Sequence, residues 1–248
     1  MRLSAYIICA TPRSGSTLLC DLLTATGVAG RPHSYFRSQD VGYWAGLWDV
    51  GGSTATSGPG FNRAYLSAMT KAGTAGTGMF GLRLMWPSVV EATKRLNAAF
   101  GGEADIANRF KTQFGPTLFI HLSRQDKTAQ AVSLVRAKQT GLWHVAADGS
   151  ERQRTAPAQA PIFDAGRISQ ARDLLMTEDA EWSRFFDQCC IQPLRLSYET
   201  LAADPKAVLA DTLTALGRDR TCAAGVDVET ARMADAMSAS WAKRMKAD

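Results

Sequence analysis

Apolar and polar positions along the chain form blocks that predict strands separated by helices. Short apolar runs at 5–10 (AYIICA), 78–85 (GMFGLRLM), 117–122 (TLFIHL) and 193–197 are typical of buried strands. Between and after them, residue spacing predicts helices at about 17–25, 61–71, 88–100, 126–139, 164–188, 205–216 and 229–246. This alternation predicts an α/β fold, with a parallel sheet flanked by helices on both faces.

Two stretches interrupt this pattern. Residues 31–60 carry several glycines and tryptophans, and residues 146–161 mix glycine, serine, proline and charges without periodicity. We expect both to be loops beside a substrate site, and 146–161 to be a mobile lid. The length of 248 residues, without an internal repeat, predicts a single domain over 1–248.

The composition narrows the function classes. The formal charge of +5 suits an anionic ligand, but no run of lysine and arginine predicts a nucleic-acid partner. The odd count of five cysteines predicts free thiols in a reducing compartment. No segment reaches the 18 or more apolar residues of a membrane span, and the N-terminus does not match a signal peptide. We therefore expect a soluble, cytoplasmic protein.

The segment 11–17 (TPRSGST) follows the first predicted strand and opens the first predicted helix. Backbone N–H groups and the positive end of a helix dipole meet at such a point and favour an anion. Gly15 permits close approach, Ser14, Ser16 and Thr17 add hydroxyl donors, and Arg13 adds a planar cation. The spacing differs from the GxxxxGK[ST] loop of nucleoside triphosphatases. The alternative is a tight turn that only caps a helix.

A second candidate anchor lies at the end of the strand predicted at 117–122. Arg124 follows that strand, and Ser133 lies nine residues further on in the next helix. Side chains at the carboxyl edge of parallel strands face the crevice where such folds bind ligands. The pair is therefore a candidate for a second anionic group, and a surface salt bridge is the alternative.

Several motifs in this order resemble those of bacterial PAPS-dependent carbohydrate sulfotransferases, where PAPS is 3′-phosphoadenosine-5′-phosphosulfate. The chain resembles the trehalose 2-sulfotransferase type over most of its length, and the likeness weakens after about residue 149. It is carried by RSGSTLL at 13–19, ATGVAG at 25–30, LMW at 84–86, the strand and arginine at 117–124, QAVS at 130–133 and the stretch around Trp143.

The resemblance implies the sulfotransferase fold, PAPS as donor, the product PAP, and a hydroxyl of a carbohydrate or glycolipid as acceptor. It also implies a homodimer. It assigns residues 13–17 to the 5′-phosphosulfate, and Arg124 and Ser133 to the 3′-phosphate. Arg13 stands where many members carry lysine, and it is the expected catalytic cation.

The catalytic base is where the chain departs from this family. The trehalose type has a glutamate shortly after ATGVAG, and Ser34 stands at that position here. Serine is a poor base, and His33 beside it has a side chain suited to proton transfer. We expect His33 to be the base, with His144 in reserve. His121 lies within a predicted strand and is expected to be a core residue.

Sulfuryl transfer resembles phosphoryl transfer, so catalysis should depend on positioning and positive charge. Arg83 adds charge at the mouth of the site or pairs with an acid. No His/Cys/Asp cluster indicates a metal, so none is expected. Two alternatives remain: a degenerate member that binds nucleotide without turnover, which Ser34 favours, and a kinase, which the missing lysine disfavours.

Overall fold

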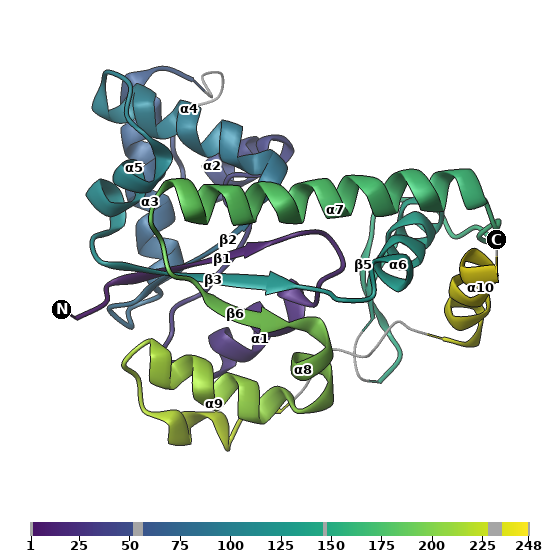
Figure 1. Cartoon of the computed structure of the whole chain (residues 1–248). Helices are drawn as coiled ribbons and strands as arrows, with labels where there is room; N and C mark the ends of the chain where they lie inside the picture. Colours follow the sequence, from purple (N-terminus) through teal and green to yellow (C-terminus); the bar gives the residue numbers. More distant parts are fainter. Residues whose placement is uncertain (1, 52–56, 146–147, 228–234, 248) are drawn as a thin grey trace.

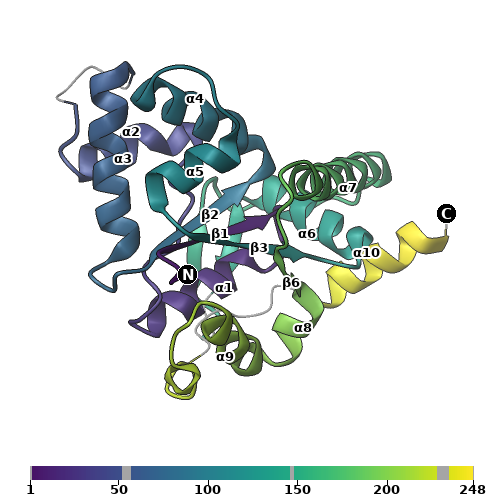
Figure 2. The same ribbon diagram turned by 60° about the vertical axis from the view of Figure 1, so that its left-hand side comes forward.

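The computed structural model describes residues 2–51, 57–145, 148–227 and 235–247. Within them, four parallel strands form one sheet in the order β2 (Phe80–Met85), β1 (Ala5–Ala10), β3 (Thr117–Ser123) and β6 (Leu194–Ser197). All four lie where the apolar runs predicted strands. The predicted α/β class with a parallel sheet is confirmed, and Figures 1 and 2 show helices on both faces.

The helices cover the predicted positions and add three more. In chain order they are α1 (Ser16–Ala25), α2 (Val41–Leu47), α3 (Pro59–Thr74), α4 (Val89–Phe100), α5 (Ile106–Phe114), α6 (Lys127–Thr140), α7 (Ala165–Gln188), α8 (Tyr198–Ala203), α9 (Pro205–Ala215) and α10 (Ala236–Ala247). The unpredicted helices are α2, α5 and α8. The helix predicted from residue 229 begins at Ala236, and positions 229–234 lie outside the described residues.

Both faces of the central strand are buried, which explains its continuous apolar run. Ile7 and Cys9 pack into a core with side chains of α3, α5 and α7. Tyr6 and Ile8 face the opposite core, which contains side chains of α1 and α9. In Figure 1, α7 crosses above the sheet, while α1 and α9 lie below it. Alternate residues of β1 thus supply two cores.

The strand order places a ligand crevice. From β1 the chain goes first to β2 on one side and then to β3 on the other. Connections that leave a parallel sheet in opposite directions open a crevice at the carboxyl ends of those strands. The segment 11–17 leaves β1 at this edge, and Arg124 follows β3 there. The fold therefore brings the two predicted anchors to one place.

The segment 142–154 differs from its predicted structure. It contains an antiparallel hairpin of β4 (Leu142–Val145) and β5 (Glu151–Arg154), where the prediction was an unstructured loop from residue 146. The prediction was wrong for 151–154 because ERQR contains no apolar residue and so gives no strand signal. Positions 146–147 lie outside the described residues.

The C-terminal helix α10 packs against α6. Trp241 is buried in a small core with Val132 of α6 and Leu175 of α7. Arg136 of α6 forms an ion pair with Asp235 just before α10. None of the helices described here is long and apolar enough to cross a membrane.

Candidate active site

The loop between β1 and α1 has the features of an anion site. Gly15 has φ 86°, and a Cβ there would lie 2.9 Å from Cδ2 of Tyr198, so both conformation and space require glycine. No side chain caps α1, and its first turn has no acidic residue. The hydroxyl of Ser14 is buried without a hydrogen-bond partner among the described residues. An anion in this loop would satisfy these donors and the helix dipole.

Arg13 is held at this loop in a strained conformation. Its φ of 64° is uncommon for a residue other than glycine, and such strain is found most often at functional sites. Its Nε donates to Oγ of Ser133 over 3.0 Å, and its Nη1 donates to the carbonyl of Trp143 over 2.7 Å. Burial, and then Arg124, lower the pKa of Arg13 to about 10, so it stays charged at neutral pH.

Arg124 reaches the same loop from the end of β3. Its guanidinium carbon lies 4.3 Å from the ring centre of Tyr198, the residue that faces Gly15. Its Nη1 donates to the carbonyl of Arg13 over 3.4 Å. The fold thus brings Arg124, Ser133 and the loop together, as the sequence predicted. Tyr198 was not predicted, because nothing near it in the chain indicates this contact.

Gln130, on the first turns of α6, acts as a clamp on the loop between β1 and α1 by hydrogen bonding to two of its residues. Its side-chain amide donates to Oγ1 of Thr11 over 2.9 Å and to the carbonyl of Pro12 over 2.7 Å. Its own oxygen accepts from Nζ of Lys127 over 3.4 Å. Gln130 and Thr11 are fully buried. The QAVS match contains Gln130, but the prediction used only Ser133 from that motif.

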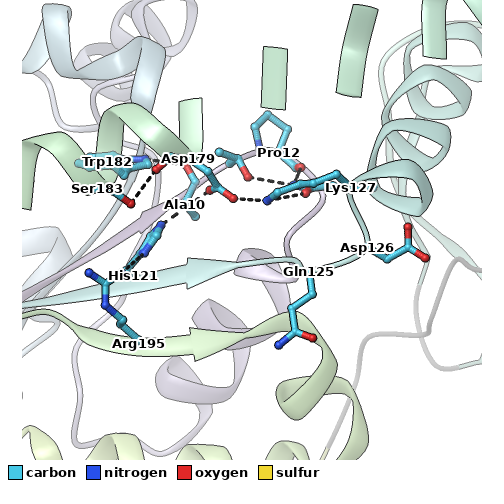
Figure 3. A network of polar contacts seen from close by, with 12 residues as sticks. Ala10, Pro12, His121, Gln125, Asp126, Lys127, Asp179, Trp182, Ser183 and Arg195 are labelled. Carbon is cyan, nitrogen blue, oxygen red and sulfur yellow. Dashed lines mark hydrogen bonds and ion pairs between the residues drawn. The ribbon is translucent and has the colours of Figure 1, made fainter. Parts of the chain in front are cut away.

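A charged network supports this clamp, and Figure 3 shows its members Lys127, Asp179, His121 and Arg195. Lys127 forms an ion pair with Asp179 of α7. His121 lies behind them, with Nε2 3.7 Å from Asp179 and Nδ1 3.1 Å from Nη1 of Arg195. Burial opposes ionisation of Asp179, but His121 and Lys127 outweigh it and lower its pKa. His121 is buried, as predicted for a core residue.

A cavity of about 540 Å³ opens beside the loop, within the size range of small-molecule sites. It lies between α1, the segment 31–40 and the β4–β5 hairpin. Its wall combines apolar side chains of α1 with polar and charged ones, which include Thr17, His33, Ser34, Arg83, His144 and Arg152. Within the described part of the chain, no group of three or more His, Cys, Asp or Glu side chains is placed to hold a metal ion.

Arg83 joins the loop to the cavity. The backbone of His33 bridges to Leu82 of β2, which brings Ser34 beside Arg83. Nε of Arg83 donates to Oγ of Ser34 over 2.8 Å, and Nη1 donates to Oγ1 of Thr17 over 2.8 Å. Arg83 was expected either to add charge at the mouth of the site or to pair with an acid, and its hydrogen bonds to Ser34 and Thr17 fit the first role.

Two histidines face this cavity. Nδ1 of His33 accepts the backbone N–H of Ser34 over 2.9 Å, and its ring packs edge-on against Trp44 at 4.8 Å. Burial, and then Arg83, lower the pKa of His33 to about 4. Nε2 of His144 lies 3.2 Å from Oγ1 of Thr17. Both sequence candidates for the base therefore reach the cavity.

A family model described as Stf0 sulphotransferase matches residues 5–248. The chain is 30% identical to trehalose 2-sulfotransferase of Mycolicibacterium smegmatis, over 99% of this chain and 95% of that protein. It is 28% identical to trehalose 2-sulfotransferase of Mycobacterium tuberculosis, over 98% and 94% of the two chains. Among solved structures, the sulfotransferase domain of the Synechococcus PCC 7002 olefin synthase matches with 15% identity and a TM-score of 0.48, over 100% and 96% of the two chains.

Proposed function

Since this chain belongs to the Stf0 sulphotransferase family, we propose that it transfers a sulfuryl group from PAPS to a hydroxyl of a carbohydrate or glycolipid. The observation that carries the proposal is the loop at 11–17 directly beside a cavity whose wall includes hydroxyl, imidazole and guanidinium groups. The loop offers an uncapped helix start, the unpartnered hydroxyl of Ser14 and the charged Arg13. These groups suit the phosphosulfate of a donor, and the cavity suits an acceptor with many hydroxyl groups.

The donor roles follow from these positions. Residues 13–17 would hold the 5′-phosphosulfate, and Arg124 with Ser133 would hold the 3′-phosphate. Arg13 contacts Ser133 directly, so one network would serve both ends of the donor. Bound there, PAPS would supply an activated sulfuryl group, and positive charge at Arg13 and Arg83 would stabilise its transfer.

The acceptor roles are assigned to the cavity. Ser34 is buried and bonded to Arg83, which suits a residue that positions its neighbour. His33 lines the cavity, where its imidazole could form a hydrogen bond with a sugar hydroxyl. Because two relatives are named for trehalose, trehalose is the first acceptor to test.

The alternative is a protein that binds the nucleotide without turnover and acts as an interaction module. Ser34, where the resemblance places a glutamate, is the observation in its favour. A cytoplasmic location and a homodimer also remain predictions for this protein.

Calorimetric titration with PAP, ADP and AMP tests the donor site. We expect clear preference for PAP, and equal affinity for the three nucleotides would overturn the proposal. Incubation with PAPS and trehalose, other sugars or glycolipids then tests turnover. Preference for PAP with no sulfated product from any hydroxyl acceptor would support the alternative.

A further inference from the structure

The β4–β5 hairpin contacts the segment 11–17, here called the donor loop, and α1 at three points. The carbonyl of Trp143 accepts from Arg13, and Nε2 of His144 lies 3.2 Å from Oγ1 of Thr17. Arg152 on the second strand donates to Asp21 of α1 over 2.8 Å. These contacts fix His144 where the donor loop meets the cavity. A side chain at that junction can reach a hydroxyl group that attacks the transferring sulfuryl group.

The hydrogen bonds give the two histidines different proton positions. Oγ1 of Thr17 accepts from Arg83, so its own hydrogen is available to Nε2 of His144. A neutral His144 in this arrangement carries its proton on Nδ1 and has a lone pair on Nε2. Nδ1 of His33 already accepts from Ser34, so a neutral His33 carries its proton on Nε2. His33 is then a hydrogen-bond donor, and His144 is an acceptor.

We propose that His144 is the base that removes the proton from the acceptor hydroxyl, and that His33 donates a hydrogen bond that orients the acceptor. This inference rests on the proposed function. When the acceptor binds, its hydroxyl group replaces that of Thr17 as the hydrogen-bond donor to Nε2 of His144. As the acceptor oxygen bonds to sulfur, its O–H bond breaks and the proton passes to Nε2. The bond from sulfur to the phosphate oxygen breaks, and that oxygen keeps the electron pair. His144 then returns its proton to water.

The charges around His144 make its pKa depend on whether the donor is bound. It faces Arg13 from the loop, Arg83 from β2 and Arg152 from β5, and Arg152 forms an ion pair with Asp21 of α1. Burial, and then these three arginines, lower the pKa of His144 to about 3. Negative charge on a bound donor would offset the arginines and raise this pKa. His144 would become a stronger base when the donor is present.

Binding tests this without turnover. Calorimetry of PAP binding at pH about 5, in two buffers of different ionisation enthalpy, measures protons taken up. We expect uptake by the wild type and by His33→Gln, and its loss in His144→Gln. Glutamine retains a polar group near the position of Nε2, so PAP affinity should change by less than about threefold. Unchanged uptake in His144→Gln, with normal PAP affinity, would overturn the role of His144 alone.

Turnover gives a second test. A general base contributes about 10²–10⁴-fold, so His144→Gln should lower kcat by at least about 100-fold and remove the acid limb of its pH profile. His33→Gln should keep that limb and raise KM for the acceptor. An acid limb that persists in His144→Gln and disappears in His33→Gln would assign the base to His33. Failure of wild-type protein to bind PAP would overturn the proposed function and this inference together.

Thermal unfolding shows whether each variant is folded, and His144→Asn serves as a second substitution if His144→Gln is not. Asparagine also lacks a base at this position, so it should lose the same proton uptake. Proton uptake by folded His144→Asn equal to that of the wild type would contradict the proposal.

Discussion

Nε of Arg13 donates to Oγ of Ser133 over 3.0 Å, although the two residues are 120 positions apart. Arg13 was predicted for the 5′ end of the donor, and Ser133 for its 3′ end. Their contact makes the two predicted anchors one hydrogen-bonded unit. A substitution at either residue should therefore affect both ends of a bound nucleotide.

Ser133→Ala should weaken PAP more than adenosine 5′-phosphosulfate, which lacks the 3′-phosphate. A hydrogen bond to a charged group is worth about 1.5–3 kcal/mol, or roughly 10- to 150-fold in affinity. The sulfate nucleotide should lose some affinity too, because Arg13 loses a partner. Calorimetry of both ligands measures the two losses, and Arg124→Ala should show the same order. Equal losses for the two ligands would contradict the 3′-phosphate assignment.

Arg13→Ala should abolish most transfer and leave the fold intact. Removing one preorganised donor to developing negative charge costs about 10²–10³-fold in kcat. Arg13→Lys retains the charge but loses the planar guanidinium that reaches Ser133 and Trp143. Its turnover should therefore lie between that of the wild type and that of Arg13→Ala. Sulfated product is measured at saturating donor, with circular dichroism as the check on folding. Near-normal turnover by Arg13→Ala would remove the loop from the mechanism.

Gln130→Met should weaken both stability and PAP binding. Methionine has a similar length but leaves Oγ1 of Thr11 and the carbonyl of Pro12 without their donor. An unsatisfied buried polar group costs about 1–3 kcal/mol. Urea unfolding measures that loss. Gln139→Met on the same helix is the control, because its amide contacts Ile162 instead of the donor loop. Similar PAP affinity for both variants would show that the clamp does not position the loop.

Asp179 should make stability depend on pH. Its pKa in the folded protein is lowered, so its stabilising effect is present above its ordinary value and is lost as the pH falls. Wild-type protein should therefore lose stability below a pH of about 4. Asp179→Asn should be less stable at pH 7 and show a weaker decline with acid. Urea unfolding across this range measures both slopes, and parallel slopes would exclude Asp179 as a source of the decline.

Patterns in short stretches of the sequence were sufficient to predict much of the fold. Asp126 and Asp164, at which two helices were predicted to begin, accept backbone N–H groups at the starts of α6 and α7. The apolar run of β1 and the glycine after it placed the donor loop. In contrast, α5 was missed because it is short and buries Arg109, whose partners are Asn97 and the carbonyls of the glycines at 101 and 102.

The site residues that were missed make contacts remote in sequence. Gln130 looks like any polar residue of a helix until its amide is seen to bond Thr11, 119 positions away. Tyr198 is the first residue of a short helix, and no pattern in the sequence around it predicts its contacts with Gly15 and Arg124. His144 was named as a candidate, but its hydrogen bond to Thr17 depends on the β4–β5 hairpin. That hairpin was not predicted, because the polar residues of β5 give no strand signal.

The clamp on Thr11 and Pro12 also has a consequence for synthesis. Gln130 is made 119 residues after Thr11, so the loop is synthesised well before the helix that holds it. At about 5–20 residues per second, the loop waits roughly 6–24 s for its support. A nascent chain that stops before α6 would contain the whole segment 11–17 and lack the groups that hold it in shape. Premature fragments should therefore not compete with the finished protein for nucleotide.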